Sequence, residues 1–331
     1  MPKLPWTASL LLILTGCAAA VPPVAEAPKP RVLELASTKW PPFTAVEGEP
    51  RVANELVALA LSADAVEAEQ TILPVDEWLA ALRSGEVDGS AAVWWSEDRA
   101  EYLLFSQPYL ENRLVLIGRT GADVSATSFS QLVGKQVGII EGYAYGEALD
   151  GADGPEFIAS PSVPDNVRAL LAGELDYVLA DALFAAYSIA THPQKLELVV
   201  GEHPLIFRAL HFAVRKDVPD AQAIIDHFDS RVRQMLRDGS YNRILGIEWL
   251  EADVDGDGLS ELIFQGTHAG VEPPTAPDYR VLTSRQRPGA EVEVQPDYII
   301  NGQRYDAWEF VPESFKVTGV GGANVGIGIR W

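Results

Sequence analysis

Cysteine is almost absent from this chain, because Cys17 is the only one among 331 residues. With a single thiol the protein can form no internal disulfide. Basic residues are also scarce: 25 Lys and Arg stand against 47 Asp and Glu, which gives a formal net charge of -22. Phosphate binding needs a basic face, so this charge balance excludes a nucleic-acid-binding protein and mainly keeps the chain soluble.

The amino terminus lacks a hydrophobic run long enough to span a bilayer. The apolar run Leu10–Leu14 follows Lys3, and this basic-then-apolar order is typical of an export signal. We predict that residues 1–16 are that signal. The run leads into Leu14-Thr15-Gly16-Cys17, and the order Leu-x-Gly-Cys resembles the bacterial lipobox, whose cysteine is acylated and becomes the first mature residue.

The lipobox resemblance implies lipidation of Cys17 and a lipoprotein held at the membrane by several acyl chains. Residues 17–30, rich in Ala, Pro and Val, then form a tether. Ala18 in place of an aspartate implies a periplasmic cell-envelope location, at the outer membrane if the cell is Gram-negative. The alternative is an ordinary cleaved signal peptide in which Cys17 occurs by chance.

What the chain does have is a dense set of signals between Ser84 and Tyr109. Gly85 follows a helical apolar pattern and suits the left-handed residue that commonly ends a helix. Val87–Val93 is small and apolar on both faces, as expected of a parallel strand covered on two sides. Ligands collect at the carboxyl ends of such strands.

The residues at that strand end suit a ligand site. Trp94 and Trp95 provide an aromatic wall, and Ser96 can cap a short helix. Arg99 then falls on the first turn of that helix and faces back toward the strand ends, so its guanidinium points at a cleft. The alternative is a surface arginine paired with a neighbouring glutamate.

The pattern VD(x)nSxxRAxxxxFSxPY, from Val87 to Tyr109, resembles the signature of the bacterial extracellular solute-binding proteins of family 3. These are the polar amino-acid binders of ABC transport, and they usually carry threonine where this chain has Ser96. The resemblance implies an α/β fold of the two-lobed, periplasmic-binding-protein-like type II, which closes on a solute about a hinge. It also implies that Arg99 grips a ligand carboxylate. The interval from Asp88 to Arg99 is slightly shorter than in the amino-acid binders.

The same resemblance sets the domain boundaries. Lobe 1 is expected to span residues 31–115 and 207–250, with lobe 2, residues 116–206, inserted into it. Leu170–Asp176 echoes Leu82–Asp88, since each is a helix end, a glycine and a strand start. The two halves are therefore expected to be built alike.

Further ligand contacts follow from the family resemblance. Trp40 and Phe43 lie after the first strand, where the family's aromatic residues commonly touch the ligand, although rim packing explains them equally well. Gly142 and Tyr143 are expected to open a helix, whose free N–H groups bind carboxylates. Asp181 ends a strand before a helix, where it either meets a ligand ammonium or caps the helix.

Residues 251–331 form a C-terminal extension that begins with an acidic loop. Carboxylates stand at positions one, three, five and nine of the loop and glycine at position six, an order that lets oxygens converge on a hard cation. The predicted calcium ligands are Asp253, Asp255, Asp257, the Leu259 carbonyl and Glu261. The loop resembles those of dockerin-like and integrin-type repeats, because the glutamate that completes an EF-hand is replaced by Phe264. The alternative is an acidic linker.

The rest of the extension carries strand patterns. Tyr298–Tyr305 contains Asn301-Gly302 and predicts a hairpin, whereas Glu291–Val294 and Val325–Trp331 alternate between apolar and polar residues. The sequence therefore predicts a small β-rich module, to which it assigns no chemistry.

Three functions fit these patterns. The first is a lipid-anchored solute-binding protein for ABC-type uptake of a small carboxylate-bearing, amino-acid-like ligand, with no cofactor beyond a structural Ca²⁺. The second is a sensory receptor that uses the extension to dock a signalling or adhesion partner. The third is a periplasmic enzyme on the same fold; the chain shows no serine–histidine–acid arrangement, but Glu141 stays open as a catalytic carboxylate. We predict a binding protein and not an enzyme.

Overall fold

The computed structural model describes residues 31–62, 66–146, 149, 154–191, 197–275, 277–281 and 294–316. The predicted export signal, the tether and Cys17 lie outside the described residues, as do Glu291–Glu293 and the strand expected at Val325–Trp331. None of the helices within the described ranges combines the length and apolar character that a membrane crossing requires.

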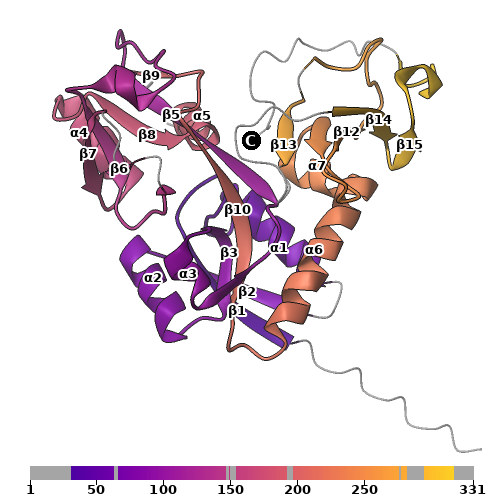
Figure 1. Cartoon of the computed structure of the whole chain (residues 1–331), viewed down its shortest axis with the longest axis horizontal. Helices are drawn as coiled ribbons and strands as arrows, with labels where there is room; N and C mark the ends of the chain where they lie inside the picture. The colour runs from indigo at the N-terminus through magenta and orange to yellow at the C-terminus, as the bar shows by residue number, and fades with distance from the viewer. Residues whose placement is uncertain are drawn as a thin grey trace, which may run out of the picture.

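Lobe 1 is a parallel sheet with helices on both faces (Figure 1). Its parallel strands are β1 (Arg31–Thr38), β2 (Val66–Leu73) and β3 (Gly89–Trp94), with the short β4 (Leu103–Phe105) nearby. Its helices are α1 (Val52–Ser62), α2 (Val75–Ser84), α3 (Glu97–Ala100), α6 (Ala221–Asp238) and α7 (Ser240–Leu245). Every residue of β3 is buried, which confirms the prediction of a strand covered on two sides.

Lobe 2 is also built from β-strands and helices, on a smaller scale. Its strands are β6 (Gln136–Ile140), β7 (Glu156–Ser160), β8 (Tyr177–Asp181) and β9 (Leu198–Val200). Its helices are the 3-10 turn η1 (Phe129–Leu132), α4 (Val163–Ala172) and α5 (Ala182–Thr191). In each lobe a left-handed glycine ends the helix before a buried strand: Gly85 has φ 84° after α2, and Gly173 has φ 83° after α4. The two echoing sequence segments therefore do adopt the same local structure.

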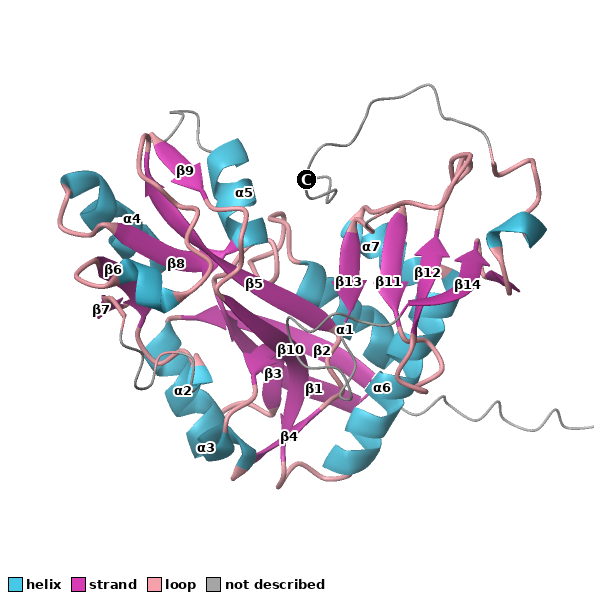
Figure 2. Ribbon diagram, turned by 45° about the horizontal axis from the view of Figure 1, so that its top comes forward, coloured by secondary structure: helices cyan, strands magenta, loops and turns pink. Residues whose placement is uncertain are grey.

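Two long strands, β5 (Leu110–Arg119) and β10 (Ile206–Arg215), connect the lobes. They pair with each other, antiparallel, over 110–114 and 206–210. Beyond that segment β5 pairs with β8 in lobe 2, and β10 pairs with β3 and β4 in lobe 1. One ten-stranded sheet therefore runs through the hinge: eight strands follow the order β2-β1-β3-β10-β5-β8-β6-β7, while β4 pairs with β10 and β9 with β5, and a lobe lies on either side of the hinge (Figure 2).

The extension forms a separate five-stranded sheet in the order β13-β11-β12-β14-β15. Its strands are β11 (Trp249–Ala252), β12 (Ser260–Phe264), β13 (Tyr279–Val281), β14 (Val294–Ile300) and β15 (Gln303–Tyr305), followed by the 3-10 turn η3 (Trp308–Phe310). The predicted hairpin is confirmed, because Asn301 and Gly302 take positive φ values of 48° and 85° between β14 and β15. The module starts at Trp249, slightly before the predicted residue 251.

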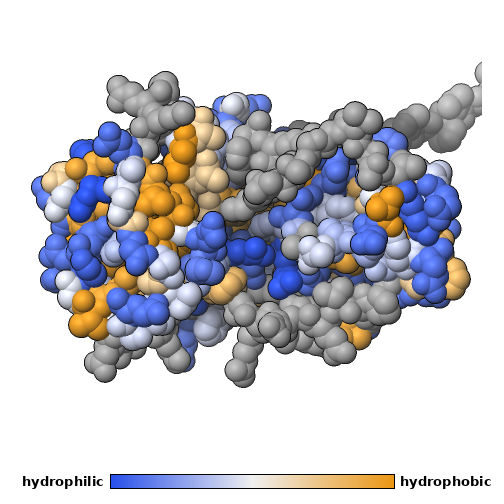
Figure 3. Space-filling view, turned by 90° about the horizontal axis from the view of Figure 1, so that it is seen from above, coloured by the Kyte–Doolittle hydropathy of each residue, from blue (hydrophilic) through white to orange (hydrophobic). Residues whose placement is uncertain are grey.

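The extension is bonded to the hinge. The Tyr279 hydroxyl, on β13, donates to the carbonyl of Glu111 at 2.7 Å and accepts from the N–H of the same residue at 2.8 Å. Glu111 belongs to the part of β5 that pairs with β10. Seen from above, the extension on the right of Figure 3 is largely hydrophilic, whereas apolar residues gather over lobe 2 on the left.

Candidate functional site

Arg99 lies between the two lobes. The Arg99 N–H donates to Ser96 Oγ at 3.3 Å, which confirms Ser96 as the cap of α3 and orients the side chain toward the end of β3. Its guanidinium donates to the Trp94 carbonyl through Nη1 and to the Gly142 carbonyl through Nη2, both at 2.9 Å. Gly142 belongs to lobe 2, and Arg99 is only 4% exposed. The guanidinium therefore joins the lobes, and burial lowers its pKa.

The Trp78 ring of α2 lies 5.3 Å from the Arg99 guanidinium carbon, and four further aromatic rings pack against one another at the interlobe contact. Trp40 and Trp94 come from lobe 1, and Tyr143 and Tyr145 come from lobe 2. The Trp94 ring makes edge contacts with Trp40, Tyr143 and Tyr145, at centroid distances of 5.6, 5.2 and 5.5 Å. The Thr38 and Tyr143 hydroxyls add a polar contact across the cleft at 3.5 Å. We call these four residues the aromatic cluster.

The other two predicted aromatic contacts are placed differently. Phe43 has no exposed surface, and its ring packs under Trp40 at a centroid distance of 4.9 Å. In this arrangement it supports the aromatic cluster from the core of lobe 1. Trp95 is 51% exposed, and its backbone carbonyl lines the end of β3.

The prediction that a helix opens at Gly142 and Tyr143 is wrong: residues 141 and 142 form a turn, 143–145 have no regular structure, and a 3-10 conformation is reached only at residue 146. Gly142 has φ 76°, a left-handed conformation that does not start an α-helix. The loop also lies close to α2 of lobe 1, because a Cβ on Gly142 would stand 3.0 Å from Leu79 Cδ1. Gly142 therefore presents its carbonyl to the site, where the sequence had predicted an N–H group.

Asp181 stands at the end of β8, as predicted, but four donors of the protein surround its carboxylate. Oδ1 accepts from the N–H groups of Leu183 and Phe184 at 2.8 and 3.2 Å, which makes Asp181 a cap of α5. Oδ2 accepts from the Arg113 N–H at 3.0 Å and from Asn112 Nδ2 at 3.2 Å. Burial raises its pKa to about 6 despite these bonds. The prediction of a ligand ammonium at Asp181 stays untested.

Sequence reasoning missed Arg208, which lies on the hinge strand β10. Its Nη2 donates to the Trp95 carbonyl at 2.8 Å, and its guanidinium carbon lies 5.7 Å from the centroid of the Trp94 ring. The available signal was an arginine inside the otherwise apolar run from Ile206 to Leu210.

A cavity of about 460 Å³ adjoins the site on the lobe 2 side. It lies between β6, β7 and the loop after β6, and its lining includes Glu141, Gly142, Tyr143 and Tyr145. Two rings of the aromatic cluster therefore border both the interlobe contact and this cavity.

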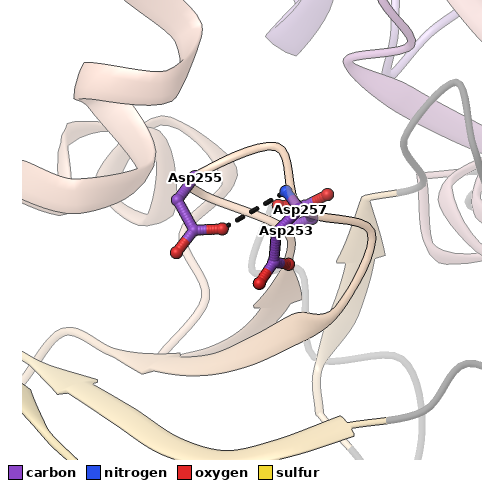
Figure 4. Close-up of side chains that lie close together, drawn as sticks. All are labelled: Asp253, Asp255 and Asp257. Atoms are coloured by element: carbon purple, nitrogen blue, oxygen red, sulfur yellow. Dashed lines mark hydrogen bonds between the residues drawn. The ribbon is translucent and has the colours of Figure 1, made fainter.

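The acidic loop between β11 and β12 brings three predicted ligands together (Figure 4). Asp253, Asp255 and Asp257 each place one carboxylate oxygen within 4.8 Å of the others. Asp253 also accepts from the N–H groups of Gly256 and Gly258, at 2.6 and 2.8 Å, so the backbone wraps around this carboxylate. The fit to a cation with oxygen ligands is good at these three positions.

Glu261, the fourth predicted carboxylate ligand, has a different partner. It is buried, and it pairs with Arg304, which also contacts Asp255 and Asp297 at 3.2 Å each. Burial and the nearby aspartates raise the Glu261 pKa to about 7, although the Val254 N–H and Arg304 oppose that rise. Leu259 lies in the loop, where its N–H donates to Asp257 Oδ1 at 2.8 Å.

Two curated proteins of bacterial origin are similar to parts of this chain. A probable histidine-binding protein of Neisseria gonorrhoeae is 26% identical over 175 residues, which are 52% of this chain and 64% of the relative. The virulence sensor protein BvgS of Bordetella pertussis is 28% identical over 116 residues, 35% of this chain and 9% of that protein. The chain thus spans less than two thirds of the length of either curated relative.

Solved structures establish the fold. An ancestral arginine-binding protein bound to arginine has a TM-score of 0.57 at 22% identity, covering 66% of this chain and 98% of that one. A histidine kinase sensor domain with similarity to periplasmic binding proteins has a TM-score of 0.56 at 22% identity, covering 65% and 95%. The sequence model of the bacterial extracellular solute-binding proteins, family 3, matches residues 36–250, which are both lobes and the hinge. With this match, the two lobes and the interlobe arginine, the chain belongs to the bacterial extracellular solute-binding proteins of family 3.

Proposed function

We propose that the protein is an extracytoplasmic solute-binding protein whose lobes close on a small carboxylate-bearing, amino-acid-like molecule, for ABC-type uptake through a membrane permease. One observation carries the proposal. The buried guanidinium of Arg99 bonds to a carbonyl of each lobe, Trp94 and Gly142, and to no carboxylate of the described residues.

A buried cation is costly unless an anion neutralises it. Carbonyl dipoles compensate the Arg99 charge only in part, and a ligand carboxylate supplies a full negative charge in a planar group that matches the guanidinium fork. Because Gly142 lies in lobe 2, a ligand at Arg99 contacts both lobes and so favours their closure. The aromatic cluster would cover the apolar part of the ligand.

The test is a thermal-shift screen of the whole chain against the proteinogenic amino acids and small carboxylic acids, followed by calorimetry of each hit. The Arg99→Ala variant should lose measurable binding of the acid found. Arg168→Ala is a matched control, because Arg168 lies on α4 with a side chain that is 75% exposed and pairs only with Asp165. Unchanged affinity in Arg99→Ala would reject the proposal.

A second function is favoured by a specific observation: the extension is bonded to the hinge strand through Tyr279 and Glu111. Such a contact allows the extension to follow lobe closure and to present that state to a signalling partner. Hydrogen exchange separates the two functions. If the acid found in the screen changes hydrogen exchange in β13 and its neighbouring strands, sensing is favoured. If it changes hydrogen exchange only in the lobes, transport is favoured.

We also propose that the chain is anchored in the cell envelope through lipidated Cys17, as its lipobox-like segment indicates. Metabolic labelling with an alkyne fatty acid should mark the wild-type protein, and Cys17→Ala should be unlabelled. Labelling of both, or of neither, would contradict the anchor.

A structural Ca²⁺ in the acidic loop is a further proposal, held by Asp253, Asp255 and Asp257, with the Leu259 carbonyl and Glu261 completing the set. Calcium that binds only the folded chain raises its melting temperature. We expect this shift in the wild type and its loss in Asp253→Asn. An absence of both shift and heat of binding in the wild type would leave the loop an acidic linker.

A further inference from the structure

Arg208 and Arg99 are bonded to neighbouring peptide groups. Arg99 Nη1 donates to the Trp94 carbonyl at 2.9 Å, and Arg208 Nη2 donates to the Trp95 carbonyl at 2.8 Å. Both guanidinium groups therefore lie at the carboxyl end of β3. The two positive charges lie close enough to repel each other, because Arg208 contributes to lowering the pKa of Arg99.

Neither arginine forms an ion pair among the residues that the structure describes; Asp98 lies near enough to Arg99 to raise its pKa slightly, but its carboxylate pairs with Arg83 at 2.7 Å. The Nε of Arg208 is buried and makes no hydrogen bond, and the face of the Trp94 ring lies over the same guanidinium. The lobe 2 loop packs against it as well, since a Cβ on Gly146 would stand 3.0 Å from Arg208 Nη1. Arg208 is therefore held at the interlobe contact with an unused donor and an uncompensated charge.

The same region offers little to a ligand cation. Two buried carboxylates lie at the hinge: Asp181, whose oxygens already accept four hydrogen bonds from the protein, and Glu111, which pairs with Arg113 at 2.8 Å. A carboxylate offers about four acceptor positions, so an incoming ammonium would have to displace one of these donors. Glu141 is exposed to solvent and lines the cavity on the lobe 2 side, so it is not a buried counter-charge for the two arginines.

We propose that the cleft takes a short dicarboxylate, with one carboxylate on Arg99 and the other on Arg208. This inference rests on the proposed function and narrows its ligand class. A diacid gives each arginine an anion and offsets the repulsion between them, whereas the ammonium of an amino acid would have to compete with the protein's own donors for the carboxylates of Asp181 and Glu111. The faces and edges of the aromatic cluster accommodate the short apolar chain between the two carboxylates.

The test is calorimetry of the whole chain with matched pairs of acids: succinate against butyrate, and glutarate against pentanoate. L-glutamate, L-arginine and L-histidine complete the panel. One additional charge-assisted contact corresponds to about 10- to 100-fold in affinity, so we expect the diacids to bind that much more tightly than the monoacids. Arg208→Gln should weaken diacid binding far more than monoacid binding and so remove most of this preference.

Arg168→Gln serves as the matched control and should keep the preference for diacids. Circular dichroism and the melting temperature verify that Arg208→Gln folds, and Arg208→Lys, which keeps the charge, should retain part of the preference. The inference is overturned if the wild type binds diacids no better than monoacids, if Arg208→Gln weakens both classes equally, or if L-arginine or L-histidine binds best.

The result also separates this inference from the proposed function. If a monoacid or amino acid binds and Arg99→Gln abolishes that binding, the solute-binding function stands and only the dicarboxylate class is rejected. If Arg99→Gln retains full affinity for whichever acid binds, the function itself is rejected.

Discussion

Arg99, on helix α3 in the hinge cleft, and Arg304, on the edge strand β15 of the extension, have different partners for their charge. Arg304 contacts the carboxylates of Asp255, Glu261 and Asp297. Arg99 contacts two backbone carbonyls and no carboxylate of the described residues. A cation that the protein has already neutralised serves its own stability, whereas a buried cation left without an anion is available to a ligand.

The largest effect on ligand affinity should come from removing the charge of Arg99. Arg99→Gln should weaken binding of the acid found in the screen by about 3–5 kcal/mol, because the ligand carboxylate would then be buried without its partner. Arg304→Gln should leave that affinity unchanged. Calorimetry of both variants measures this, and an equal loss in both would end the distinction between the two arginines.

A pH titration should sharpen the comparison from the side of the carboxylates. If Asp181 neutralised the cleft arginines its pKa would be lowered; burial instead raises it from 3.8 to about 6. The folded state then binds the proton more tightly than the unfolded state, so this stabilising contribution is complete below pH 3.8 and is lost as pH rises through 6. The change is about 3 kcal/mol, at 1.36 kcal/mol per pKa unit.

The measurement is urea unfolding of the wild type and Asp181→Asn between about pH 3.5 and 7. The advantage of the wild type over the variant should shrink with rising pH. Asp176→Asn is the control of opposite sign, because hydrogen bonding to the Gln136 N–H lowers the Asp176 pKa. An advantage of Asp181 that grows with pH would mean that a cation of the cleft does pair with it.

Arg304 should matter for stability where Arg99 matters for binding. Arg304→Gln leaves the buried Glu261 beside Asp255 without a cation, and we expect a loss of about 2 kcal/mol in unfolding free energy, less than for a fully buried pair because the Arg304 side chain is 41% exposed. Calcium should restore part of the loss if it binds the loop. An Arg304→Gln variant as stable as the wild type would show that the acidic cluster needs no internal cation.

The smallest expected effect concerns the contact between the two regions. Tyr279→Phe removes a hydroxyl that makes two hydrogen bonds to the Glu111 backbone, at a cost of about 1–2 kcal/mol in unfolding free energy. Tyr305→Phe is the control within the same sheet. If the extension of Tyr279→Phe unfolds at a lower denaturant concentration than the lobes, the Tyr279 hydroxyl couples their unfolding. An unfolding curve identical to that of the wild type would show that other contacts hold the extension.

Local signals were enough to predict several parts of the site. The Gly85 helix end, the buried strand β3, the Ser96 cap and the inward direction of Arg99 all lie within a few residues of one another, so chain geometry alone relates them. The Asn301-Gly302 turn was predicted for the same reason, since its backbone angles suit those two residue types.

Other parts depended on residues far apart in the chain. The helix expected at Gly142 was wrong because the loop packs against α2 and turns its carbonyl to Arg99, 43 residues away. Arg208 was missed because its partner, the Trp95 carbonyl, is 113 residues distant. Asp181 shows both cases: its helix cap was predicted locally, whereas its bonds to Asn112 and Arg113 come from the pairing of β5 with β8.

The sequence by itself determined the elements, the two similar halves and the family, because periodicity, caps and turn residues act over short distances. The tertiary structure decided which charges are neutralised: it gave Arg304 its carboxylates, surrounded Asp181 with donors, and left Arg99 and Arg208 with backbone carbonyls and aromatic rings and no ion pair among the described residues. The reason is that the energy of a charge depends on what folding buries beside it, which residue order does not specify.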